Sequence, residues 1–276
     1  MLTINNIIPL FTSSLTIYES REIKSIAYIV IEELFGFNKS QTIINANYLI
    51  NLNQENKILE ILKKLNQNIP IQYILGKTSF YNSTFFVNNH TLIPRPETEE
   101  LVKWILDFSF NNVLDVGTGT GCIPITLALN SDAKISALDI SSEALLVAEK
   151  NCNHYNINLN LICSNIFHYK TEEKFDLIIS NPPYVLNSEK TFMHKNVIDN
   201  EPHLALFVDD NNPLIYYKYI IEFSSNSLLA NGLLFFEINE RFSFEIISIL
   251  KDYNFVNIEL KKDINGKDRM IKASKK

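Results

Sequence analysis

Apolar residues in the first part of the chain recur every three or four positions, which is typical of amphipathic helices. One stripe runs from Ile23 to Leu34 and another from Ile58 to Leu65. Gly36 suits the end of the first of these helices. The pattern predicts a small N-terminal helical domain over residues 1–75, with both stripes buried in its core.

The period changes to strand-like alternation over residues 77–93, where Phe80, Phe85 and Val87 alternate with polar residues on either side of Asn82-Ser83. This alternation with a polar break predicts a β-hairpin. We place the hairpin at residues 76–94, as a linker to a second domain at residues 95–276.

From Asn111 onward, short apolar runs alternate with helical stripes, as in a mostly parallel α/β sheet covered on both faces. The predicted strands are residues 112–116, 134–139, 160–163, 175–180, 233–237, 255–260 and 269–273. The predicted helices are residues 122–130, 142–155, 214–229 and 242–252. A short link containing Gly266 joins the last two strands, which must be antiparallel because a parallel crossover needs about a dozen residues.

Composition narrows the function classes. The chain has 276 residues, 46% of them hydrophobic, which suits about two domains. Its net charge of −6 gives no general attraction to nucleic-acid phosphates, although a local basic patch stays open. The N-terminus does not resemble a signal peptide, and no apolar run approaches the roughly 20 residues of a membrane span.

Cysteines and histidines show no metal-binding pattern. The three cysteines, Cys122, Cys152 and Cys163, have no CxxC spacing, and their odd number makes a poor disulfide framework. The five histidines show no HxxxH or HExxH arrangement. We therefore expect reduced thiols, a cytoplasmic location and no metal.

A glycine-rich turn, Asp115-Val116-Gly117-Thr118-Gly119-Thr120-Gly121, follows the first predicted strand of the sheet. Glycines let the backbone adopt positive φ and approach a ligand closely. The turn is not a P-loop, and Cys122 or Pro124 stands where a dinucleotide motif has its third glycine. With no pyrophosphate to hold, a nucleoside carrying a sulfonium group fits better than NAD.

Asp139 ends the next predicted strand, ahead of Ser141-Ser142. An acidic residue there commonly accepts hydrogen bonds from ribose hydroxyls. A lone aspartate before serines can equally be a helix cap or a turn residue. Its position after the glycine-rich turn favours ribose binding.

The segment Asn181-Pro182-Pro183-Tyr184 follows the apolar run 175–180 directly. Its prolines stop the strand and fix the direction of the Pro182 carbonyl. The Asn181 side-chain oxygen and this carbonyl would then accept two hydrogen bonds from one NH2 group, with the Tyr184 ring on its flat face. Read alone, the segment is also consistent with a strand stop and a surface tyrosine.

A proline-rich start introduces the predicted helix before the sheet, in Pro94-Arg95-Pro96-Glu97-Thr98-Glu99-Glu100. Pro96 fits the first helical turn, and the glutamates complement the helix dipole. Arg95 either forms a surface ion pair or faces the active site.

These segments, in order, resemble the release factor glutamine methyltransferases, the HemK or PrmC family. Glu201-Pro202, Ala205-Leu206 and the segment from Asp263 to Arg269 add to the resemblance, which covers nearly the whole chain. It implies a class I methyltransferase sheet, S-adenosylmethionine as cofactor, and a helical domain that recognises peptide chain release factors. The implied substrate is the glutamine of their Gly-Gly-Gln motif, methylated on its side-chain amide.

The resemblance also assigns roles to residues. Substrate binding and orientation are implied for Asn181, Pro182, Pro183 and Tyr184. Cofactor contacts are implied for Asp115, Gly117, Thr118, Gly119, Thr120, Gly121, Asp139, Asn165, Ile166 and Asn181, with Asn165-Ile166 beside the adenine.

The chain departs from the family pattern at three asparagines. Asn165 stands where the family usually has an aspartate, and a neutral acceptor binds the adenine amine more weakly. Asn82 and Asn239 replace common glycines, and asparagine is the non-glycine residue that best tolerates positive φ.

Other functions stay open on the sequence alone. A ribosomal-protein glutamine would present the same amide, and an adenine amine would present the same two N–H donors. A cofactor-binding module without catalysis is a further alternative, although nucleoside binding would not require Asn181. We expect a monomer that contacts release factors and neither nucleic acid nor a membrane.

Overall fold

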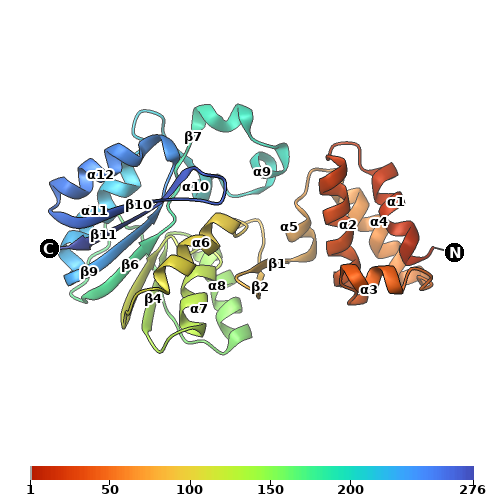
Figure 1. The fold of residues 1–276 in the computed structure, drawn as a ribbon, viewed down its shortest axis with the longest axis horizontal. Helices are drawn as coiled ribbons and strands as arrows, with labels where there is room; N and C mark the ends of the chain where they lie inside the picture. Colours follow the sequence, from red (N-terminus) through yellow and green to blue (C-terminus); the bar gives the residue numbers. More distant parts are fainter. Residues whose placement is uncertain (1) are drawn as a thin grey trace. The chain divides into compact units, whose positions relative to one another are not determined.

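The computed structural model describes residues 2–276 (Figure 1). The chain forms two compact units. The first runs to Gly76 and also contains His194–Asn200, and the second consists of Lys77–Met193 and Glu201–Lys276. The hairpin that we placed between two domains belongs to the second unit.

The first unit is helical, as predicted. Its helices are α1 (Ile4–Ser14), α2 (Ser20–Phe35), α3 (Lys39–Ile44), α4 (Leu52–Leu65), α5 (Ile71–Leu75) and α9 (Lys195–Asn200). The stripes of α2 and α4 are largely buried, and Gly36 ends α2 at φ +70°. Helix α1 lies within the predicted helical domain, ahead of its two apolar stripes: it buries Ile4, Ile7 and Phe11 but contains Pro9, which normally argues against a helix.

The hairpin forms from β1 (Lys77–Phe80) and β2 (Ser83–Phe86), which pair antiparallel. Its turn residues Tyr81 and Asn82 have φ values of +48° and +59°. Asparagine at position 82 therefore adopts the conformation that a glycine would take there.

A seven-stranded sheet forms the centre of the second unit, in the order β10-β11-β9-β6-β3-β4-β5. The strands are β3 (Asn112–Val116), β4 (Lys134–Asp139), β5 (Asn160–Cys163), β6 (Phe175–Ser180), β9 (Leu228–Glu237), β10 (Phe255–Lys262) and β11 (Asp268–Lys275). The first five of these pair in parallel, and β11 pairs antiparallel with both β9 and β10. The predicted class I methyltransferase fold is confirmed.

Helices cover both faces of this sheet (Figure 1). They are α6 (Pro96–Ile105), α7 (Cys122–Leu129) and α8 (Ser142–Tyr155) on one face, and α11 (Ile215–Ser227) and α12 (Ser243–Asp252) on the other. Successive strand residues point to opposite faces, so Leu177 and Ile179 pack with α6 and α7 while Ile178 packs with α11. Burial on both faces explains the continuous apolar runs of the central strands.

Two features of the sheet were not evident from the sequence. Strand β9 begins at Leu228, five residues before the predicted start, because Asn231 at φ +62° and the adjoining Gly232 hide its first part. Short elements also lie between β6 and α11, namely β7 (Val185–Leu186), η1 (Asn187–Phe192), α10 (His203–Leu206) and β8 (Phe207–Val208), and another, η2 (Glu240–Phe242), precedes α12.

None of the helices described in residues 2–276 combines the length and apolar character needed to cross a bilayer.

Candidate functional site

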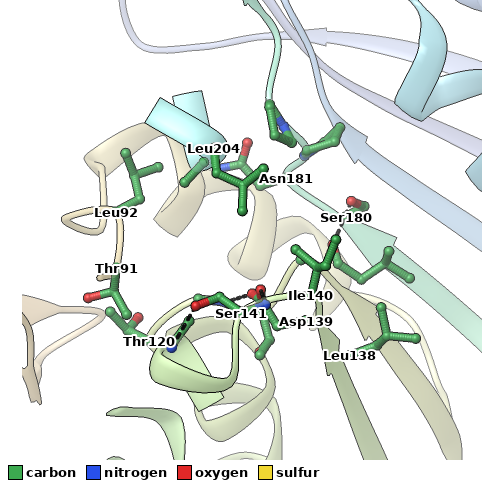
Figure 2. Close-up of a pocket in the computed structure, with 18 of the residues that line it drawn as sticks. Thr91, Leu92, Thr120, Leu138, Asp139, Ile140, Ser141, Ser180, Asn181 and Leu204 are labelled. Carbon is green, nitrogen blue, oxygen red and sulfur yellow. Dashed lines mark hydrogen bonds between the residues drawn. The ribbon is translucent and has the colours of Figure 1, made fainter. Parts of the chain in front are cut away.

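A cavity opens at the carboxyl edge of β3, β4 and β6, where the loops that follow these strands meet (Figure 2). The connections that follow the neighbouring strands β3 and β6 run in opposite directions at this point, from β3 to β4 on one side and from β6 to β9 on the other. Ligands of open α/β sheets bind at such a switch point. The cavity is lined by both sequence-predicted segments, the glycine-rich turn and the loop beginning at Asn181.

The glycine-rich turn presents bare backbone to this cavity. Gly117 and Gly119 line it with φ values of +81° and +54°. A Cβ atom added at Gly119 would meet nothing within 4 Å, and at Gly117 it would meet only the Asn181 carbonyl oxygen, at 4.0 Å. The turn therefore leaves open space over its backbone for a ligand.

Asp139 holds the turn from the neighbouring strand. Its Oδ2 accepts a 2.8 Å hydrogen bond from the Gly119 N–H, and its Oδ1 accepts one of 2.9 Å from the Ser141 N–H. Each oxygen keeps a second lone pair for a ligand hydroxyl. Ser141 caps helix α8, and its hydrogen bond to Asp139 forms the turn that leads into this helix. Asp139 is therefore a turn residue as well as a residue that lines the cavity. Burial raises the pKa of Asp139, and its backbone hydrogen bonds oppose that rise.

Two residues of the predicted cofactor set lie behind the cavity wall. Asp115 is fully buried, and burial raises its pKa to about 7 although the nearby Thr118 hydroxyl opposes the rise. Gly121 begins helix α7 at φ +76°, where a Cβ atom would come within 3.2 Å of the Ala148 Cβ. Helix packing and backbone conformation thus explain why residue 121 is a glycine.

A largely apolar wall completes this end of the cavity. Leu138, Ile140, Ile166 and Phe167 line it together with Asn165. The Asn165 Oδ1 accepts a 2.9 Å hydrogen bond from the Phe167 N–H. The Asn165 amide is therefore already hydrogen-bonded within its own turn.

Asn181, Pro182 and Pro183 form the opposite side of the cavity. The Ser180 hydroxyl donates a 2.6 Å hydrogen bond to the Val116 carbonyl, which joins the ends of β6 and β3. Asn181, which follows β6, and Asp139, which ends β4, thus line one cavity on either side of the glycine-rich turn (Figure 2). Tyr184 is not among the lining residues.

The Tyr184 side chain instead belongs to a buried hydrogen-bond network. Its hydroxyl donates to Glu237 Oε1 at 2.8 Å. The Thr98 hydroxyl donates to Glu237 Oε2 at 2.6 Å and accepts from Asn181 Nδ2 at 3.2 Å. Arg269 lies at the far end, with its Nη1 3.5 Å from the Tyr184 hydroxyl.

Sequence reasoning assigned no role to three residues that support this site. Glu237 had one usable signal, since it is an acidic residue at the end of an apolar strand. Asn151 gave no such signal: it is buried, and its Nδ2 donates to the Phe86 and Thr120 carbonyls at 3.0 and 2.9 Å. Asn239 adopts an extended φ of −73°, so the expectation of positive φ was wrong there; its Nδ2 donates to the Tyr184 carbonyl.

Arg95 lines the cavity and forms an ion pair with Glu201, at 2.6 Å between Nη2 and Oε1. Glu201 is buried, and its Oε2 also accepts a hydrogen bond from the Ile93 N–H. The contact joins the segment before α6 to the segment that leads into α10. Arg95 therefore lies at the site, and its ion pair is with a buried carboxylate and is not the surface ion pair given as the alternative.

We expect Glu201→Ala to lower the free energy of unfolding of the second unit by about 2 kcal/mol, because it leaves a part-buried guanidinium and a buried N–H unpaired. Denaturant titration followed by fluorescence of Trp104, the single tryptophan, measures this loss. Glu240→Ala is the matched control: its ion pair with Lys267 is exposed at both ends, and its loss should cost less than about 1 kcal/mol. Equal losses in the two variants would contradict the structural role of Glu201.

The donors and acceptors of the cavity fit a sulfonium nucleoside. The open backbone of the glycine-rich turn suits the amino-acid part of such a nucleoside. The remaining lone pairs of Asp139 suit its ribose, and the apolar wall containing Ile166 suits its base. Among residues 2–276, no group of three or more His, Cys, Asp or Glu side chains is arranged to hold a metal ion. The three cysteines are free thiols, with Cys163 exposed and the other two buried.

Two family models match different parts of the chain. Residues 12–76 match the family model of the PrmC N-terminal domain, and residues 97–205 match that of the methyltransferase small domain.

Comparison with individual proteins extends the similarity over almost the whole chain. A release factor glutamine methyltransferase of Flavobacterium psychrophilum is 43% identical over 268 residues, with 94% of each chain covered. The corresponding protein of Bacteroides thetaiotaomicron is 37% identical over 264 residues, covering 94% of this chain and 95% of the relative. A solved methyltransferase from Pyrococcus furiosus shares the fold, with a TM-score of 0.54, 16% identity, and coverage of 81% of this chain and 98% of its own.

Proposed function

The chain belongs to the release factor glutamine methyltransferase family, and from this premise we propose that its cavity methylates the glutamine amide nitrogen of the Gly-Gly-Gln motif in peptide chain release factors. The cofactor is S-adenosylmethionine. The single observation that carries the site assignment is that Asn181 and the glycine-rich turn line one cavity. Methyl donor and acceptor amide can therefore meet between them.

The cofactor, when bound, supplies a methyl group that is already activated as a sulfonium. We assign the backbone of Gly117 and Gly119 to its amino-acid part, Asp139 to its ribose, and Asn165 with Ile166 to its adenine. The protein needs to provide binding and alignment, and alignment contributes up to about 7–11 kcal/mol in favourable reactions.

The substrate amide is a poor nucleophile because its nitrogen lone pair is delocalised into the carbonyl. Asn181 Oδ1 and the Pro182 carbonyl are the acceptors that we assign to its two N–H groups. Accepting both bonds orients the nitrogen and stabilises the positive charge that develops on it during transfer. No base is assigned, because the methylated product can release its proton to water.

The finer assignments follow from this proposal. The N-terminal helical unit recognises the release factor, and the second unit holds both ligands. The enzyme acts as a monomer in the cytoplasm, where release factors meet the ribosome, and it requires neither nucleic acid nor a membrane.

A labelling experiment tests the proposed substrate. The protein is incubated with methyl-labelled S-adenosylmethionine and, separately, with release factor, ribosomal protein and DNA, and labelled peptides are then mapped. We expect label on the Gly-Gly-Gln glutamine and none on a release factor with alanine at that position. Label only on a ribosomal-protein glutamine or a DNA adenine would assign the other substrate, and cofactor binding without transfer would indicate a binding module.

A further inference from the structure

A carboxamide can face a substrate with either of two ends, and only one end of Asn181 suits an amide N–H. The oxygen accepts hydrogen bonds, whereas the nitrogen only donates them. Rotation by 180° exchanges the two ends with almost no change in shape. The proposed chemistry therefore needs a device that keeps Oδ1 toward the cavity.

Thr98 is the neighbour that distinguishes the two ends. A hydroxyl has one hydrogen to donate, and this one is directed to Glu237 Oε2 at 2.6 Å. Toward Asn181, 3.2 Å away, the Thr98 oxygen can then only accept. Asn181 must offer Nδ2 on that side, so Oδ1 is left on the other.

Glu237 sets the direction of the Thr98 hydrogen bond. Both of its oxygens accept, one from Thr98 and one from the Tyr184 hydroxyl, which is the pattern of an ionised carboxylate. The residue is 1% exposed, and a buried polar group without its partners is costly. Each hydroxyl in the network therefore has one favourable direction.

Several charged or titratable groups face Glu237. Arg269 favours its charged form, while Glu97 and the burial itself disfavour it. The Tyr217 hydroxyl donates to the Glu237 backbone carbonyl at 3.2 Å. Arg269 is itself held by Asp263, at 3.1 Å from Nε to Oδ2.

We infer that Thr98 and Glu237 are positioning residues that keep the acceptor end of the Asn181 carboxamide toward the substrate amide. The inference rests on the proposed function and adds to it the residues that hold the glutamine-binding group in its active orientation. Neither residue has to touch the cofactor for this role.

Protonation of Glu237 would reverse the direction of the hydrogen bonds that hold Asn181. A protonated carboxyl can donate to Thr98, whose hydroxyl can then donate to Asn181 Oδ1 and draw it away from the substrate. Burial, as the largest effect, raises the pKa of Glu237 above its ordinary 4.5. The turnover number should therefore fall as the pH is lowered through that raised pKa.

The test compares Thr98→Val with Thr98→Ser in steady-state kinetics with release factor. Valine keeps the shape but removes the hydroxyl, and we expect the turnover number to drop about 10- to 100-fold. The dissociation constant for S-adenosylhomocysteine, measured by titration calorimetry, should stay within about threefold. Serine restores the hydroxyl and should recover most of the turnover.

Thr126→Val is the matched control. Thr126 is 2% exposed against 3% for Thr98, and its hydroxyl donates to the Cys122 carbonyl in helix α7, away from the network. It should keep wild-type turnover. Glu237→Gln adds a second measurement, because a side chain that does not titrate should remove the fall in turnover at low pH.

The outcomes are distinguishable. A folded Thr98→Val variant with a turnover within twofold of wild type overturns the positioning role. Should that variant not fold, an unchanged low-pH fall in Glu237→Gln, or an unchanged turnover with Thr98→Ala, overturns it instead. Absence of release factor methylation by the wild type would be a failure of the proposed function and not of the positioning network.

Discussion

Asn181→Ala is expected to lower the turnover number for release factor methylation by about 10²–10³-fold, while the affinity for S-adenosylhomocysteine changes by less than about threefold. The truncation removes the side-chain acceptor on the substrate side of the cavity. One of the two N–H groups of the glutamine then loses the hydrogen bond that strengthens as charge develops on nitrogen. Steady-state kinetics and calorimetric titration separate the two effects.

Asn160→Ala is the control for this variant. Asn160 Nδ2 donates to the Ser136 hydroxyl oxygen at 3.2 Å, the same kind of bond at the same length as that between Asn181 and Thr98. It lies at the start of β5 and does not line the cavity. Its turnover should match the wild type; an unchanged turnover in Asn181→Ala would refute the proposed role of the carboxamide.

Asp139→Ala is expected to weaken the binding of S-adenosylmethionine on the order of 100-fold. The change removes two carboxylate acceptors for ribose, and hydrogen bonds to a charged group contribute about 1.5–3 kcal/mol each. It also frees the Gly119 N–H, which Asp139 holds at 2.8 Å, so the glycine-rich turn loses part of its preorganisation. Calorimetric titration with S-adenosylmethionine gives the dissociation constant.

Two further variants, Asp139→Asn and Asp252→Ala, serve as an intermediate case and a control for this prediction. Asparagine keeps one acceptor and should give an intermediate affinity. Asp252 is an exposed aspartate at the end of α12, outside the cavity lining, and its removal should leave the affinity unchanged. If Asp139→Ala bound the cofactor as tightly as Asp252→Ala, Asp139 would be only a turn residue.

The bounds of the central strands could be predicted from the sequence, whereas the order of the strands within the sheet could not. The central strands β3, β4 and β6 begin and end where the apolar runs predict, because burial on both faces requires such runs. The position of β11 between β9 and β10 was not predicted. In the structure, β10 lies at the edge with mostly exposed residues, whereas Met270, Ile271 and Ala273 of β11 are buried.

The candidate site also has local parts that the sequence predicts and an arrangement in space that depends on the fold. The sequence by itself determined the local parts: a glycine-rich turn after one strand, an aspartate after the next, and Asn181 held by prolines after a third. Each depends on neighbouring residues, through the φ freedom of glycine and the restrictions of proline. Their convergence follows from parallel strands, whose carboxyl ends share one edge.

Only the tertiary structure decided how Asn181 is oriented and how the cavity is closed. Thr98 and Glu237 are separated by 139 residues, and Arg95 and Glu201 by 106, yet each pair is in contact. A hydrogen bond depends on distance in space, and no local pattern of hydrophobic and polar residues encodes which distant side chains meet. The same fold that aligns the strands brings these polar groups together, and burial then leaves each of them one favourable partner.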